Sequence, residues 1–106
     1  MTTQEIVLFN KVDYSDHKLL RKLYAQYEGL HSVGTKNQVA LCICMDLVQA
    51  IENAFLTEKE KNIMNVYIET GGEIEAIINK MNLARATIFR NIGSAIKKIS
   101  IFLREY

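Results

Sequence analysis

LTEKEKNIMNVYIETGGEIEAIINKMNLARATIFRNIGSAIKKISIFL, residues 56–103, predicts three consecutive helices because its apolar residues recur at intervals of three and four. The end of this stretch is biased in charge. Residues 83–104 include five basic side chains and no acidic one, although the whole chain has a net charge of only +1. A basic helix that follows a short turn fits the major groove of DNA. The pattern therefore indicates duplex DNA as a partner.

Local signals set the ends of the first of these helices. Thr57 and Glu60 have the spacing of a capping box, so the helix is predicted to begin at Glu58. Gly71 and Gly72 end it, because glycine accepts the left-handed conformation of a helix C-cap. Its inward stripe is predicted to consist of Ile63, Met64, Tyr67 and Ile68.

A short helix over residues 73–81 and a longer one over residues 85–103 form a predicted helix-turn-helix. Asn82 lies in the turn, because asparagine tolerates a positive φ. We expect Ala76 at the close crossing of the two helices and Ile88 as the inward anchor of the second one. The other inward positions are Ile74, Ile77, Ile78, Met81, Ile92, Ala95, Ile96, Ile99 and Leu103.

Residues 1–54 form a predicted subregion for packing and oligomerisation, and residues 55–106 the DNA-binding subregion of the same domain. A short extended start is expected around residues 6–9. Asp13 or Ser15 then caps an amphipathic helix that is expected to run to about residue 30.

The next predicted elements are a loop over residues 31–37 and a helix that runs to about Ala54, capped by Thr35 or Asn37. Residues 39–45 are apolar all round, so this part of the helix is expected to be buried on every side. It is predicted to be either a central helix or an oligomer interface.

Composition favours an all-α protein. The chain contains no proline, and about half of its 106 residues are apolar. Its longest apolar run, residues 39–45, is too short to cross a bilayer, and the N-terminal MTTQEIVLF lacks a basic start and a cleavage site. We therefore expect a cytoplasmic protein without a membrane partner.

Candidate chemistry is sparse. Cys42 and Cys44 are expected to be buried thiols that act as small hydrophobes, and His17 and His31 have no metal-ligand spacing. There is no glycine-rich phosphate loop and no nucleophile with an adjacent base. The sequence therefore predicts neither an enzyme nor a cofactor or metal site.

Three segments, LTEKEKNIMNVYIE, EIEAIINKMNLARATIF and SAIKKI, resemble region 4 of the bacterial sigma-70 family over about half of the chain. The matching positions are residues 74–76, Leu83, Thr87, Ile88 and residues 95–99. The N-terminal VDYSDHKLLRKLYAQYEGL, joined to this end, is similar to phage regulators of the ArpU and RinA types. The resemblance implies a sequence-specific DNA-binding regulator of late genes of a phage or prophage in a bacterial host.

The same resemblance maps the DNA-contacting surface onto Arg85, Ala86, Phe89 and Arg90, with Thr87 near the backbone. Ala86 and Phe89 replace residues that are often polar in sigma factors, so the family's promoter specificity does not carry over. Each arginine is able to donate two hydrogen bonds to guanine. Phe89 has two interpretations at this stage, a contact to a thymine methyl group or a core side chain.

Further polar side chains complete the predicted interface, although each also fits an ordinary solvated surface. Lys97 and Lys98 lie ten or more residues along the last helix, where flanking phosphates or another protein are the expected contacts. The full DNA-binding set is Lys59, Lys61, Arg85, Ala86, Thr87, Phe89, Arg90, Asn91, Ser94, Lys97 and Lys98.

Double-stranded DNA is the main predicted partner, and RNA polymerase and a second copy of the chain are candidate partners. The alternative function is a protein-interaction module that binds RNA polymerase or a sigma factor without specific DNA binding.

Overall fold

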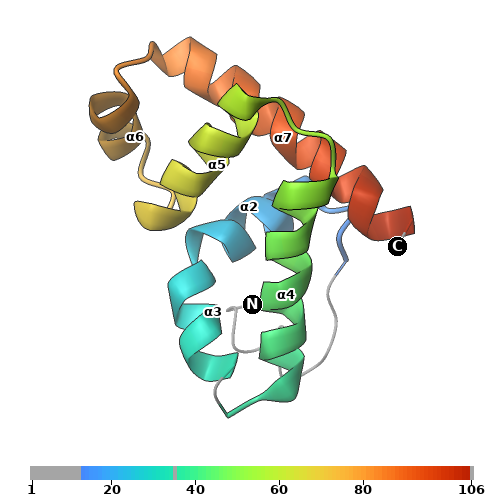
Figure 1. The fold of residues 1–106 in the computed structure, drawn as a ribbon. Coiled ribbons are helices and arrows are strands. Elements are labelled where there is room, and N and C mark those ends of the chain that lie inside the picture. The colour runs from blue at the N-terminus through green and yellow to red at the C-terminus, as the bar shows by residue number, and fades with distance from the viewer. Residues whose placement is uncertain (1–12, 35, 106) are drawn as a thin grey trace.

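The computed structural model describes residues 13–34 and 36–105, and within these ranges the chain forms six helices and no strand. The predicted all-α class is therefore confirmed. In chain order the helices are α2 (His17–Ala25), α3 (Tyr27–Gly34), α4 (Gln38–Asn53), α5 (Glu58–Glu69), α6 (Ile74–Met81) and α7 (Arg85–Glu105), as Figure 1 shows. The predicted extended start at residues 6–9 lies outside the described residues.

The N-terminal half differs from its prediction in two places. The cap of α2 is Asp16, whose carboxylate accepts hydrogen bonds from the backbone N–H groups of Lys18 and Leu19. The expected single helix to residue 30 is wrong, because the chain leaves helical geometry at Gln26 and continues as α3 to Gly34. The predicted loop over residues 31–37 is correspondingly shortened. This bend lets α3 pack alongside α4 (Figure 1).

Helix α4 is capped by Asn37 and has nearly its predicted length, but its burial was predicted wrongly. The side chains of Leu41 and Met45 are 42% and 53% exposed, and Cys42 is exposed while Cys44 is buried. The reason is geometric. Helices α3, α5 and α7 pack against α4 and leave part of its circumference open.

The C-terminal half follows its local signals closely. Thr57 and Glu60 form the predicted capping box at the start of α5. Gly71 and Gly72 have φ values of 67° and 80°, and Asn82 adopts the left-handed conformation with a φ of 54°. A Cβ atom at Gly72 would lie only 3.0 Å from the Cβ atom of Ala25, so this turn also lets α2 approach closely.

One stripe of α7 forms the middle of the core. Its fully or almost fully buried side chains are Ile88, Ile92, Ala95, Ile96, Ile99 and Ser100, and α2, α4, α5 and α6 all pack against this helix. Buried hydroxyl groups hold the layers together. Tyr24 donates a hydrogen bond to the Leu47 carbonyl oxygen at 2.8 Å, and Ser100 donates one to the Tyr14 carbonyl oxygen at 2.8 Å.

Candidate nucleic-acid interface

Helices α6 and α7 meet at a tight turn in which Asn82 adopts the left-handed conformation, and their contact is apolar. Ile77 of α6 and Ile88 of α7 are both fully buried, so Ile88 is the inward anchor that the sequence predicts. Ala76, which precedes Ile77 in α6, is half-buried. Because α7 also packs along α5, its first turns are held firmly at one end of the molecule (Figure 1). The rotation of α7 about its own axis is set by these buried contacts.

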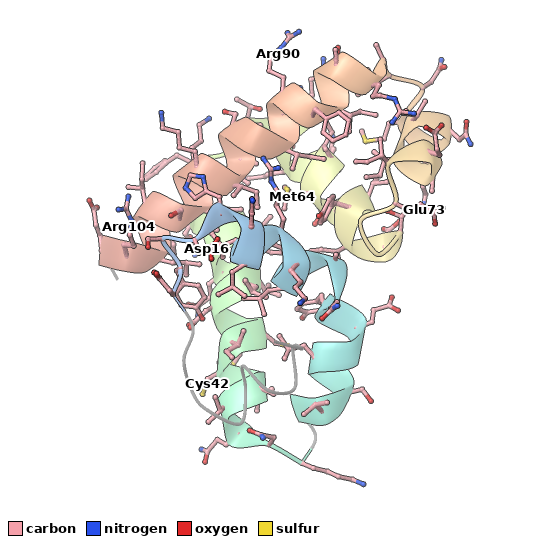
Figure 2. The ribbon with its side chains drawn as sticks, turned by 180° about the vertical axis from the view of Figure 1, so that it is seen from behind. Asp16, Cys42, Met64, Glu73, Arg90 and Arg104 are labelled. Carbon is pink, nitrogen blue, oxygen red and sulfur yellow. The ribbon has the colours of Figure 1, made fainter. Side chains whose placement is uncertain are left out.

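That rotation exposes four residues, which we call the α7 N-terminal surface: Arg85, Ala86, Phe89 and Arg90. They lie on the first two turns of the helix, next to the stripe of buried residues that begins at Ile88. Phe89 is 46% exposed, so its interpretation as a core residue is wrong. Figure 2 shows the Arg90 side chain extending from α7 away from the other helices.

Arg85 has a partner within the helix-turn-helix. Its guanidinium forms an ion pair with the Glu75 carboxylate of α6, and both side chains stay more than half exposed. An exposed pair of this kind is weak. The contact therefore leaves Arg85 accessible, while it draws the guanidinium toward α6.

Thr87 and Asn91 lie at the margin of the α7 N-terminal surface, and both are half-buried. The Asn91 amide donates a hydrogen bond to the Thr87 carbonyl oxygen at 2.8 Å. This side chain is thus directed along its own helix.

Lys98 lies elsewhere and has a structural partner. Its ammonium group donates a hydrogen bond to a Glu60 carboxylate oxygen at 2.7 Å, and Glu60 is only 2% exposed. The same oxygen accepts a hydrogen bond from the Thr57 N–H at 2.8 Å, which closes the capping box of α5. The carboxylate therefore ties the start of α5 to the middle of α7.

These contacts set the ionisation of Glu60. Burial on its own would raise the pKa of the carboxyl group, but hydrogen bonds from Lys98, Ser94 and the Thr57 N–H outweigh it and lower the pKa to about 2. Ser94 and Lys98, both predicted as DNA contacts, are thus placed where they stabilise a buried anion.

The predicted set therefore divides into two groups. Lys59, Lys61 and Lys97 belong with Lys98, because the start of α5 lies beside the middle of α7. Lys59 and Lys97 are exposed, and Lys61 is half-buried. Along α7 this group begins about 18 Å from Arg85, at 1.5 Å per residue. One contact with a short segment of DNA does not need both groups.

Arg21 of α2 is a cation that the sequence analysis did not assign to the site. A guanidinium nitrogen of Arg21 lies 3.7 Å from the position that a Cβ atom on Gly93 would occupy. Its side chain therefore lies against α7, between the two groups of α7 cations. The basic trio Lys18, Arg21 and Lys22 was visible in the sequence, but its placement beside α7 depends on tertiary packing.

No family model matches this chain, and the comparisons with curated proteins and with solved structures found no match either. Within residues 13–34 and 36–105, no group of three or more His, Cys, Asp or Glu side chains is arranged to hold a metal ion. Across the same ranges, no helix has the length and apolar character needed to span a membrane.

Replacing Glu60 by Gln should destabilise the protein by about 1 to 3 kcal/mol at neutral pH, because Lys98 loses a charged acceptor in a buried position. The lowered pKa of Glu60 means that its contribution is complete above about pH 4.5 and is lost as the pH falls toward about 2. Urea unfolding of both proteins over this range should show the stability difference shrinking toward acid pH.

Glu58→Gln is the matched control, since it removes an exposed carboxylate two residues away and should change the free energy of unfolding by less than about 0.5 kcal/mol. Equal destabilisation by the two substitutions, or a stability difference that does not vary with pH, would contradict the anchoring role of Glu60.

Proposed function

We propose that this chain is a sequence-specific transcription regulator that binds duplex DNA through the α7 N-terminal surface. One observation carries the proposal. Two arginines, an alanine and a phenylalanine are exposed together on the first two turns of a helix that follows a tight turn, and α7 has no acidic residue before Glu105. A surface of this composition complements both the phosphate backbone and the base edges of a major groove.

The mechanism is recognition without chemistry. The first turns of α7 enter the major groove, which is about 12 Å wide and admits a helix. Arg90 donates two hydrogen bonds to the O6 and N7 atoms of a guanine. Arg85 contacts a neighbouring base or phosphate once its ion pair with Glu75 is broken. Helix α6 lies across the phosphate backbone of the DNA and fixes the angle at which α7 enters the groove.

Electrostatic attraction to phosphates supplies the part of the affinity that does not depend on sequence. Arg21, Lys97 and Arg104 add exposed positive charge along α2 and α7, whereas Lys98 is engaged by Glu60. Contact with four or five phosphates gives a slope of log affinity against log salt of about −3.6 to −4.5, at about 0.9 per phosphate.

The biological setting comes from the resemblance to sigma-70 region 4 and to regulators of the ArpU and RinA types. This resemblance supports a role in the control of late genes of a phage or prophage in the cytoplasm of a bacterial host. Contact with RNA polymerase near the bound site is part of the same proposal.

Arg90→Ala should weaken binding to a selected operator duplex by about 5-fold to 150-fold, because a bidentate arginine–guanine contact is worth about 1 to 3 kcal/mol. Arg85→Ala should weaken it in the same direction by a smaller factor, since Glu75 already competes for this side chain. Fluorescence anisotropy between about 50 and 200 mM salt measures both the affinities and the salt slope.

Lys36→Ala provides the control, because it removes one positive charge in the turn between α3 and α4, at the opposite end of the molecule from the start of α7 (Figure 1). Its affinity should stay within about twofold of the parent. A salt slope near zero, or equal effects of all three substitutions, would contradict the proposal. RNA polymerase binding that survives Arg85→Ala and Arg90→Ala, with no DNA binding by the parent, would favour the protein-interaction module.

One further surface of the molecule favours a second copy of the chain as a protein partner. Leu41, Met45 and Val48 of α4 are each at least 42% exposed, and with Tyr27 and His31 of α3 they line an open groove of about 300 Å³. The groove has no Asp, Glu, Lys or Arg in its lining. Because a two-fold axis brings the same patch together from both subunits, an uncharged patch meets itself without repulsion. Such a dimer would present two α7 helices to two half-sites.

Met45→Lys should shift the protein toward monomer in light scattering, because it places like charges opposite each other in a two-fold contact. Gln26→Lys adds the same charge at an exposed position outside the groove and should leave the dimer intact. A monomeric parent protein at high concentration would contradict the dimer.

A further inference from the structure

We propose that Phe89 and Ala86 recognise the 5-methyl group of thymine, so that the operator contains thymine beside the guanine that an arginine reads. This inference rests on the proposed function and adds to it the identity of a second base. It concerns two side chains that differ from the polar residues usual at these positions in the sigma-70 family.

Exposure is the first argument. Phe89 keeps 46% of its surface in solvent, although Ile88 and Ile92 on the same helix are at most 2% exposed. Its ring therefore contributes little to the core of this chain. An apolar side chain in the centre of a basic surface gains free energy when a ligand covers it with apolar atoms.

The charge of the α7 N-terminal surface indicates which ligand would cover Phe89. Arg85 and Arg90 flank Phe89, and α7 offers no carboxylate until Glu105. The flanking cations favour a polyanion, and the ring favours an apolar group carried by it. Within the major groove of DNA the only apolar group on a base edge is the thymine methyl, which phenylalanine and alanine side chains are suited to contact.

Spacing supports a compact recognition element. Residues 85–90 rise by about 7.5 Å along the helix axis, at 1.5 Å per residue. Base pairs are stacked about 3.4 Å apart, so this surface covers about two or three successive pairs. The operator is therefore expected to place thymine next to guanine, with Phe89 on the methyl group and Arg90 on the purine.

The experiment uses the tightest duplex selected from a random-sequence library by the full chain, and the same duplex with every thymine replaced by deoxyuridine. Uracil pairs like thymine and lacks only the methyl group. The parent protein should bind the thymine duplex about fourfold more tightly for each methyl group covered, the factor expected for burial of one methyl-sized group.

Phe89→Ala should abolish most of this preference for thymine over uracil, and Phe89→Leu should retain part of it because an apolar side chain remains. Phe55→Ala is the matched control, since Phe55 is 92% exposed in the link between α4 and α5 and its removal should leave the preference unchanged. Thermal melting followed by circular dichroism checks that each variant is folded.

Three outcomes would overturn the inference. Equal binding of the two duplexes by the parent protein would exclude recognition of the methyl group, and a preference that survives undiminished in Phe89→Ala would exclude Phe89 as the residue that contacts it. Failure to select any duplex would remove the proposed function as well. The first two results would leave DNA binding itself intact, so the two failures are distinguishable.

Discussion

Helix α7 has one side buried in the core and another side exposed to solvent, and the rest of the structure depends on how these two sides are oriented. One stripe of its side chains, which includes Ile88, Ile96 and Ile99, is fully buried, and α2, α4, α5 and α6 pack against this helix. The outer side contains arginines and lysines without a neighbouring carboxylate on the same helix until Glu105. Burial of each isoleucine contributes about 1.5 to 3 kcal/mol, so rotation of α7 about its axis would be costly. The orientation of its outer residues follows from its core.

Two devices fix α7 along its length. Near its start, Asn82 in the left-handed conformation reverses the chain within a few residues and brings α6 against Ile88. Near its middle, the buried Glu60 carboxylate accepts hydrogen bonds from Lys98 and from the Thr57 N–H at the start of α5. The first device decides which residues face outward. The second holds α5 in place. For this reason Lys98 is a structural residue, although it belongs to the basic helix α7.

Local signals made much of this predictable from the sequence. The capping box at Thr57, the glycine pair after α5, the turn at Asn82 and the isoleucine spacing of α7 are each determined within a few residues of chain. The candidate site was predictable only to the extent that it depends on these signals. Periodicity placed Ile88 inward, but it did not decide between burial and exposure for Phe89, because that residue borders the buried stripe.

The errors arose where distant contacts decide the outcome. The predicted burial of residues 39–45 assumed neighbours all round α4, whereas the packing of α3, α5 and α7 leaves Leu41 and Met45 exposed. Gln26 interrupts the first helix without proline or glycine to signal it. The Glu60–Lys98 pair and the approach of Arg21 to Gly93 join residues that are far apart in the sequence. No local sequence pattern therefore predicts these contacts.

Titration of the isotopically labelled protein with duplex DNA, followed by backbone amide NMR shifts, tests the central claim most directly. The account predicts that the largest shifts occur over residues 85–91 of α7, with smaller ones at α6 and Arg21, and that α3 and α4 remain unchanged. Shifts concentrated on the α3–α4 groove, or none anywhere at low salt, would contradict the assignment of the α7 N-terminal surface as the DNA-binding site.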